Sequence, residues 1–243
     1  MFYRSLAGYY DLIFPAEQNK TAFLHKEFTA AGARRVLDLA CGTGTYALEL
    51  ARLGYEAWGT DLEPVLVNKA QKKAADTQLA ARFAVGDMRE PDALGLMFDG
   101  LFCIGNSLAH LLEKNDLMKA LAAMRKVLHS PGRAVLQIVN FDRILAAGDT
   151  KLTLIEREGL RFTRTYRPWG EERLLFDSVL EVTGKDEGAD RFENCVILRP
   201  IRRADLETLL LEAGFTVVRA YGDYNYGEYR AADSQATIAV AEC

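Results

Sequence analysis

The chain has 243 residues, which is long enough to bury the core of one domain and still carry an insertion. Its hydrophobic content of 49% and charged content of 26% are typical of a globular protein and exclude a disordered chain. The 30 basic residues against 34 acidic ones give a net charge of −4, so nucleic acid is not expected as the main partner.

The cysteines and the hydropathy pattern exclude further classes. Neither a zinc site nor a disulfide framework is expected, because no C-x-x-C spacing or histidine cluster accompanies Cys41, Cys103, Cys195 and Cys243. No apolar run approaches the roughly 18 residues of a membrane span, and residues 1–5 do not open a signal peptide. The sequence therefore predicts a cytoplasmic protein with no membrane partner and no bound metal.

Residues 1–31 are predicted to form one or two helices that act as a lid or a flank for a sheet. Apolar and aromatic residues recur there at helical spacing, and Pro15 interrupts the pattern. Tyr10 belongs to this pattern, and two interpretations of it stay open. It packs in the core, as aromatic residues at helical spacing usually do, or it covers a ligand.

The chain is organised around residues 35–53, which predict a strand, a glycine loop and a helix. The strand contains Asp38, and the loop carries Gly42 and Gly44. Glycine permits φ > 0 and, because it has no Cβ, lets a ligand approach the backbone. The N-terminus of the following helix also faces a ligand bound at this loop. Gly42-x-Gly44-x-x-Ala47 equally fits a nicotinamide-binding turn, or a turn without a ligand. Asp38 favours a ligand with an ammonium group over one with a pyrophosphate.

Five strands of one sheet are predicted at 35–39, 55–61, 82–86, 98–104 and 133–140. Asp61 lies 17 positions after Gly44, close to where an α/β nucleotide-binding fold places a carboxylate against ribose hydroxyls. It could instead cap the helix that begins near Pro64. Asp87 follows the third strand, where Gly-Asp is also common turn chemistry. With Asp38, three acids therefore stand at the ends of consecutive strands.

The segment after the fourth strand is expected to border the ligands, because ligands of open α/β sheets bind beyond the carboxyl ends of the strands. Asn106 offers a hydrogen-bond donor and an acceptor, and His110 can exchange a proton near neutral pH. His110 could equally be a structural histidine at a helix end, with its ring nitrogens hydrogen-bonded within the protein. A helix is predicted from Asn115 to Leu128, followed by a turn at 129–132.

Residues 151–200 are predicted to form an antiparallel β insertion, with strands at 152–155, 160–166, 173–182 and 191–198 and a polar turn at 184–188. The insertion is expected to cover the substrate side of the sheet or to form a dimer interface. Four of its side chains could bind an acidic or aromatic substrate, namely Arg161, Arg164, Arg167 and Trp169. They could equally belong to an ordinary solvent-exposed face of the strands.

The end of the chain predicts a helix and a strand pair. The helix is expected over 202–213, and the strands over 215–221 and 236–241. Because no helix separates these two strands, they are expected to pair antiparallel. The aromatic loop 223–230 between them is predicted to lie at the surface.

Several of these motifs resemble those of one family. The string V-L-D-L-A-C-G-T-G at 36–44 resembles the first motif of the class I S-adenosylmethionine (SAM)-dependent methyltransferases. Within that family, I-G-N-S-L-A-H-L at 104–111 and Asn140-Phe141-Asp142 resemble segments of the glycine and sarcosine N-methyltransferases. The resemblance covers nearly the whole chain.

The resemblance implies an α/β fold with a Rossmann-like doubly wound sheet of seven strands, the last antiparallel, and an antiparallel β insertion after strand five. Residues 32–150 and 201–243 would form the SAM-binding domain, 1–31 its helical lid or flank, and 151–200 the insertion.

The implied activity is methyl transfer from SAM to a small-molecule acceptor, with S-adenosylhomocysteine as product and an amine nitrogen favoured over oxygen or carbon. Glycine methyltransferases carry an arginine where this chain has Val139, which argues against glycine as acceptor because valine cannot pair with a carboxylate. Asn106 and His110 would be catalytic. The implied cofactor contacts are Tyr10, Asp38, Ala40, Gly42, Gly44, Asp61, Leu62, Asp87, Met88 and Ile104.

Other functions remain compatible with the pattern. An NAD(P)-dependent oxidoreductase should show a third glycine in the turn, where this chain has Ala47, and gives no reason for Asp38. A non-catalytic SAM-binding module could act through its β insertion as an interaction surface. A methyltransferase acting on RNA or protein is disfavoured by the acidic pI. A homodimer is left open.

Overall fold

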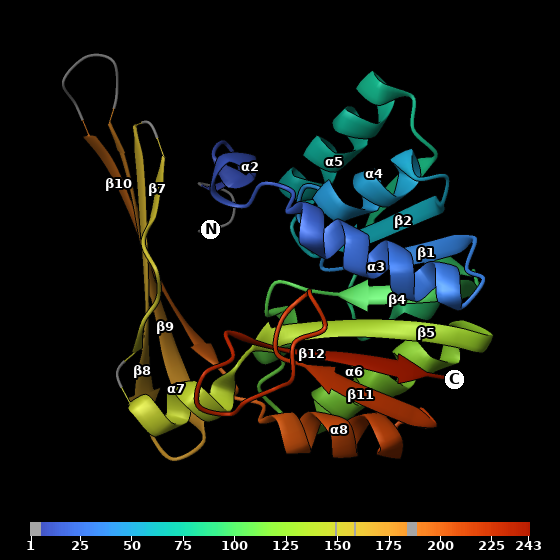
Figure 1. Ribbon diagram of the computed structural model, residues 1–243. Coiled ribbons are helices and arrows are strands. Elements are labelled where there is room, and N and C mark those ends of the chain that lie inside the picture. The colour runs from blue at the N-terminus through green and yellow to red at the C-terminus, as the bar shows by residue number, and fades with distance from the viewer. Residues whose placement is uncertain (1–5, 149, 158, 184–188) are drawn as a thin grey trace.

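The computed structural model describes residues 6–148, 150–157, 159–183 and 189–243. These residues form a larger sheet with helices on both faces and a smaller antiparallel sheet beside it (Figure 1). The turn predicted at 184–188 lies outside the described residues. No helix in the described part of the chain combines the length and the apolarity that a membrane crossing requires.

The larger sheet has seven strands, and its short apolar runs are typical of strands that are buried on both faces. They are β1 (Arg35–Leu39), β2 (Glu56–Asp61), β3 (Ala81–Val85), β4 (Phe98–Cys103), β5 (Leu128–Val139), β11 (Val217–Tyr221) and β12 (Ala236–Glu242). Their order is β11-β12-β5-β4-β1-β2-β3, and β12 runs antiparallel to both of its neighbours. The predicted fold class is therefore confirmed.

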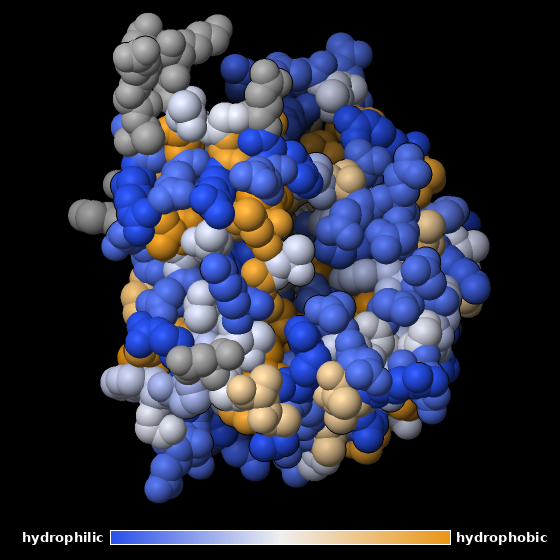
Figure 2. Space-filling view, turned by 60° about the vertical axis from the view of Figure 1, so that its left-hand side comes forward, coloured by the Kyte–Doolittle hydropathy of each residue, from blue (hydrophilic) through white to orange (hydrophobic). Residues whose placement is uncertain are grey.

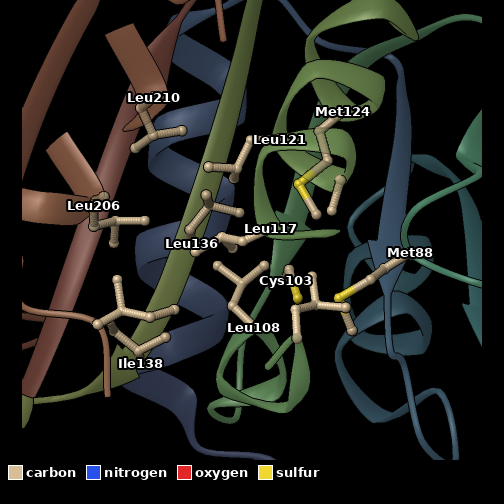
Figure 3. Close-up of a cluster of buried hydrophobic side chains, with 14 of the residues drawn as sticks. Met88, Cys103, Leu108, Leu117, Leu121, Met124, Leu136, Ile138, Leu206 and Leu210 are labelled. Carbon is tan, nitrogen blue, oxygen red and sulfur yellow. The ribbon is translucent and has the colours of Figure 1, made fainter. Parts of the chain in front are cut away.

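Helices pack on both faces of this sheet (Figure 1). One face carries α3 (Gln18–Ala30), α4 (Thr45–Arg52) and α5 (Pro64–Thr77), and the other carries α6 (Lys114–Lys126) and α8 (Arg203–Glu212). Figure 3 shows the cluster on the second face, in which β5, α6 and α8 meet. Leu136, Leu121 and Leu210 contribute one fully buried side chain from each of these three elements.

Short helices lie at the carboxyl edge of the larger sheet. They are α2 (Tyr10–Ile13), the 3-10 helix η2 (Ser107–His110) and α7 (Phe141–Ala147). A second 3-10 helix, η1 (Pro91–Leu94), precedes β4 and lies along α6, where Asp92 pairs with Lys126 at 2.8 Å. Asn140 caps α7, because its side-chain oxygen accepts a hydrogen bond from the N–H of Arg143 at 3.1 Å.

The smaller sheet consists of β6 (Thr150–Lys151), β7 (Ile155–Arg157), β8 (Leu160–Trp169), β9 (Arg173–Thr183) and β10 (Ala189–Leu198). Its path is β10-β9-β8-β6, and β7 also pairs with β8. It stands beyond the carboxyl end of β4 (Figure 1). At one end its apolar side chains pack on Leu6 and Ile13, and at the other Tyr166 packs against Phe141 at 6.2 Å between ring centres.

Two local predictions were wrong. The turn predicted at 129–132 does not precede the strand, since β5 begins at Leu128, which pairs with Phe98 of β4. A register shift between Phe98 and Gly100 accommodates the turn-forming residues inside the ladder. The aromatic loop 223–230 is not wholly at the surface. Tyr224 is 8% exposed and packs edge-on against Phe23 at 5.4 Å.

Gly100 in β4 gives a test of this packing. The change Gly100→Ala should lower the free energy of unfolding by about 1–3 kcal/mol. The added Cβ would lie 2.6 Å from Cδ1 of the fully buried Phe28. Urea unfolding followed by circular dichroism measures the loss.

Gly8→Ala is the control for that variant. No heavy atom lies within 4 Å of a Cβ built there, so the free energy of unfolding should change by less than about 0.5 kcal/mol. Equal unfolding midpoints for the two variants would contradict the steric explanation.

Candidate active site

The loop between β1 and α4 presents its backbone at the carboxyl edge of the larger sheet. Ala40, Gly42 and Gly44 adopt the left-handed region, with φ of +58°, +55° and +74°. A Cβ on Gly42 would lie 2.6 Å from the hydroxyl oxygen of Tyr10, and one on Gly44 would lie 2.5 Å from a ring carbon of Phe83. Both positions therefore require glycine for backbone conformation and for space. Tyr10 of α2 lies directly against this loop.

Asp61, at the end of β2, holds the loop in place. Its Oδ2 accepts a hydrogen bond from the N–H of Gly42 at 2.8 Å, and its Oδ1 accepts one from the N–H of Glu63 at 2.9 Å. Each carboxylate oxygen keeps a second lone pair that a ligand hydroxyl can use. The bond to Glu63 stands immediately before α5, so Asp61 also orders the start of that helix.

Asp38 lies beside Asp61 and is almost fully enclosed, with 3% of its surface exposed. Burial raises the pKa of Asp38 well above its ordinary value, and the charge of Asp61 raises it further. Burial also raises the pKa of Asp61. No basic side chain among the described residues offsets either charge. Two buried carboxyl groups without a cation of their own suit a cationic ligand.

Polar contacts fasten α2 over the loop. The hydroxyl of Thr43, in the loop, donates a hydrogen bond to Asp11 of α2. Asp11 also pairs with Lys73 of α5, with 3.0 Å between Nζ and Oδ1, and Lys69 donates to the carbonyl of Ala7. The N-terminal segment therefore closes over the loop from the side of α5.

The third acid has a different environment. Both oxygens of Asp87 accept hydrogen bonds from Arg89, the shorter at 2.6 Å between Nη2 and Oδ2. This pairing lowers the pKa of Asp87 below its ordinary value. Asp87 is therefore ionised at neutral pH. The N–H of Arg89 also donates to its Oδ1 at 2.8 Å, so a ligand amine would share or replace one of the bonds from Arg89.

The apolar residues beside these acids differ in exposure. Leu62, next to Asp61, is 63% exposed and offers apolar surface to a planar ring. Met88, next to Asp87, is 8% exposed, and its side chain points toward Cys103 inside the hydrophobic cluster (Figure 3). Only a small part of Met88 is left for contact with a ligand.

At the carboxyl end of β4, Asn106 joins three segments. Its Oδ1 accepts a hydrogen bond from the N–H of Val139 at 3.1 Å, and its Nδ2 donates to the hydroxyl of Tyr166 at 3.3 Å. The N–H of Gly105 donates to Oε1 of Gln137 at 2.8 Å. Asn106 adopts φ +72°, a conformation that asparagine tolerates better than most residues. It therefore connects the end of β4 with β5 and with the smaller sheet.

His110, at the end of η2, is exposed. Solvent reaches its side chain, yet the protein around it desolvates the ring and lowers the pKa of His110 below its ordinary value. The N–H of Arg199 donates to the carbonyl of Ala109 at 2.8 Å, so η2 lies where the chain leaves β10. Figure 2 shows a furrow with apolar walls between the smaller sheet and the rest of the molecule.

The structure brings the sequence-predicted residues to two neighbouring places at one edge of the sheet. Tyr10, Asp38, Ala40, Gly42, Gly44 and Asp61 surround the loop after β1, and the 9% exposed Ile104 leads into Asn106 and His110 after β4. Leu62, Asp87 and Met88 follow β2 and β3 at the same edge. No metal-binding group of three or more His, Cys, Asp or Glu residues was found within the described residues.

Sequence reasoning missed two residues of this edge. Gln137 is 9% exposed and stands in the apolar run of β5, and a polar residue in such a run is a signal that could have revealed it. Tyr166 carries no such signal, because its contact with Asn106 joins positions 60 residues apart.

Comparison with known proteins identifies the family. Residues 36–132 match the methyltransferase domain family. Over 203 residues the chain is 30% identical to a glycine/sarcosine N-methyltransferase of Parasynechococcus marenigrum (strain WH8102), covering 79% of this chain and 67% of that protein. The chain belongs to the class I SAM-dependent methyltransferases.

Solved structures share the fold of this methyltransferase. A SAM-dependent methyltransferase from Clostridium acetobutylicum ATCC 824 is 17% identical with a TM-score of 0.84, covering 99% of this chain and 98% of that chain. The sugar N-methyltransferase KedS8 from Streptoalloteichus sp ATCC 53650 is 22% identical with a TM-score of 0.75, covering 96% and 92%.

SAM is the cofactor of this methyltransferase, and the residues after β1 and β2 fit it. SAM carries an α-ammonium and a sulfonium, and Asp38 and Asp61 are buried carboxyl groups that no cation of the described chain offsets. The absence of side chains at Gly42 and Gly44 leaves the backbone open to a ligand. The nicotinamide-dependent oxidoreductase and the non-catalytic module are set aside with this assignment.

The loop geometry predicts the effect of a single methyl group. Gly42→Ala should weaken SAM binding by at least about tenfold, since the added Cβ would displace Tyr10 from the loop. Isothermal titration calorimetry measures the affinity. Gly54→Ala is the control, because Gly54 also has positive φ, +95°, but no atom lies within 4 Å of its Cβ. Equal losses in both variants would show that backbone strain, and not the contact with Tyr10, is responsible.

The buried acid predicts a pH dependence of SAM binding. The affinity should fall as the pH is lowered from neutral, beginning above the range in which exposed aspartates titrate. Burial raises the pKa of Asp38 in the free protein, whereas a bound cation stabilises its ionised form and lowers that pKa. Binding therefore releases protons wherever the free carboxyl group is protonated, and a lower pH opposes it.

Calorimetry in buffers of different ionisation enthalpy measures this proton release. Asp38→Asn should bind SAM weakly and without the release. Asp76→Asn, an exposed position in α5, should retain both the affinity and the release. Proton uptake by the unsubstituted protein, or an affinity independent of pH, would contradict the prediction.

Proposed function

We propose that this methyltransferase methylates an amine nitrogen of a small molecule. The 30% identical relative is named a glycine/sarcosine N-methyltransferase, which supports nitrogen as the acceptor atom. The observation that carries the proposal is His110, a solvent-reachable imidazole of lowered pKa close to the carboxyl end of β4.

The reaction requires a neutral amine. Bound SAM supplies an electrophilic methyl group on its sulfonium. An alkylammonium acceptor has no lone pair until it loses a proton, and desolvation keeps the imidazole of His110 neutral near pH 7. His110 accepts that proton and passes it to solvent in the furrow. The N–C bond then forms as the C–S bond breaks.

Asn106 orients the acceptor in this proposal. Its amide is held by Val139 and Tyr166, which use one lone pair of Oδ1 and one N–H of Nδ2. The second N–H and the second lone pair are left to fix the direction of the nitrogen. An in-line approach of nitrogen, carbon and sulfur is the main contribution that a protein makes to this reaction.

The cofactor-contact residues take the following roles in the proposal. Asp38 pairs with the α-ammonium group, and Asp61 accepts from the ribose hydroxyls. Asp87 accepts from the adenine amine, with Leu62 and the exposed edge of Met88 against the ring. Ala40, Gly42, Gly44 and Ile104 bring the main chain close to SAM, and Tyr10 covers it.

We assign the flanking segments to the exclusion of water. Residues 1–31 form the lid, because Asp11 and Ala7 are tied to the loop and to α5. Residues 151–200 cover the acceptor side, because one face of the smaller sheet contacts both α2 and Asn106. This contact favours an acceptor cover over a dimer interface for that face.

A transfer assay tests the acceptor atom and the role of His110. Purified protein, methyl-labelled SAM and a panel of primary and secondary amines should yield N-methyl products by mass spectrometry. His110→Gln should lower kcat by about 10²-fold near neutral pH, with activity recovering as the pH rises toward the pKa of the amine.

The matched control for His110 is His129→Gln. His129 is exposed and pairs with Asp99 at 2.9 Å, away from the loop after β4. That variant should retain full turnover. Products methylated on oxygen or carbon would overturn the amine proposal, and full activity of His110→Gln at neutral pH would remove His110 as the proton acceptor.

A further inference from the structure

The smaller sheet carries a polar row across its buried face. Arg164 of β8 stands directly opposite Ser178 of β9, which stands opposite Asn194 of β10. The flanking residues Phe162 and Tyr166, two positions away on β8, are both buried. Because side chains alternate along a strand, the row and these aromatic residues point to the same face.

This row lies between the two places where the sheet meets the rest of the enzyme. On one side Phe162 packs edge-on against Phe14, at 5.9 Å, next to α2. On the other side Tyr166 accepts the hydrogen bond from Asn106 at the end of β4. The rise of a strand places Arg164 about 7 Å from each of them. The row therefore lies between these two contacts, on the face of the smaller sheet that packs toward α2 and the end of β4.

The polar atoms of the row are incompletely satisfied. Nη2 of Arg164 donates to the carbonyl of Thr153 at 2.9 Å, but its Nε is buried without a partner. Ser178 is 1% exposed, and its Oγ also lacks a partner. Buried donors without partners destabilise a protein unless a ligand or water satisfies them.

The guanidinium of Arg164 lies over the ring of Phe162, with 5.5 Å between its Cζ and the ring centre. Among the described residues no carboxylate forms an ion pair with it, and desolvation lowers the pKa of Arg164. On the opposite face two arginines are paired with carboxylates, Arg167 with Asp177 at 2.6 Å and Arg191 with Glu181 at 2.5 Å. A half-buried guanidinium without a counter-ion, on the face that covers the acceptor side, is suited to an anion.

We propose that Arg164 and Ser178 form an oxyanion subsite in the cover of the acceptor site. The guanidinium and the serine hydroxyl donate hydrogen bonds to a carboxylate or a phosphate of the methyl acceptor, while its amine lies toward Asn106. This inference rests on the proposed function and adds the acceptor's class, an amine that also carries an oxyanion.

Direct binding tests the subsite without relying on turnover. Three probes share an aminoethyl group: β-alanine carries a carboxylate, O-phosphoethanolamine a phosphate, and ethanolamine neither. Each is titrated by calorimetry into the enzyme saturated with S-adenosylhomocysteine. At least one anionic probe should bind about tenfold or more tightly than ethanolamine, and the stronger of the two identifies carboxylate or phosphate as the group.

Variants then assign the preference to the row. Arg164→Gln should abolish the preference for the anionic probe over ethanolamine, and Ser178→Ala should reduce that preference. Arg164→Lys should retain part of it, because a lysine keeps the charge but not the planar fork of donors. Arg161→Gln, on the exposed face of the same strand, is the control and should leave it intact. Unchanged S-adenosylhomocysteine affinity in each variant excludes a general loss of structure.

The outcomes separate this inference from the proposed function. Equal or undetectable binding of all three probes, or a preference that survives Arg164→Gln, overturns the subsite. If an anionic probe binds through Arg164 but is methylated on oxygen, the subsite stands and the amine proposal fails. If neutral amines are methylated as readily as anionic ones, the amine proposal stands and the subsite fails.

Discussion

The buried carboxyl pair beside the glycine loop is the interaction on which the edge of the larger sheet depends. Asp61 fixes the loop through the N–H of Gly42, and Asp38 lies enclosed next to it. Without a cation of the described chain, burial disfavours the ionised form of both carboxyl groups, and the charge of Asp61 further disfavours ionisation of Asp38. A cationic ligand would relieve this cost, so the burial that strains the free protein suits this edge of the sheet to a cofactor that carries positive charge.

The cover of the site depends on contacts that no single segment supplies. Helix α2 has four residues, too few to be stable alone, and it is ordered by Asp11 against Thr43 and Lys73 and by the apolar packing of Ile13 on the smaller sheet. The smaller sheet is in turn held by Tyr166 at Asn106. Helix α2 and the smaller sheet therefore support each other, and in the proposed function this mutual support links enclosure of the cofactor to enclosure of the acceptor.

Much of the fold was predictable because its signals are local. The apolar runs of β1 and β4, the glycines of the first loop and the acids that follow β1, β2 and β3 lie within a few residues of the structure they determine. The bulge in β5 was not predictable, because residues 129–132 favour a turn and only pairing with β4 at Phe98 extends the strand through them. Tyr224 was misjudged for a similar reason, since its burial depends on Phe23, far away in the sequence.

The sequence by itself determined the doubly wound sheet, the family of the enzyme and the chemical types at the strand ends, because side-chain period and glycine conformation act over neighbouring residues. Only the tertiary structure decided which arginines of the inserted strands pair with a carboxylate and which do not. Arg164 and Arg167 differ little in sequence context, yet the first is half-buried on the face that packs toward α2 and the end of β4, and the second pairs with Asp177. The pairing of β8 with β9 and the docking of that sheet on α2 and Asn106 make the difference, and burial, not residue type, sets the electrostatic cost of an unpaired charge.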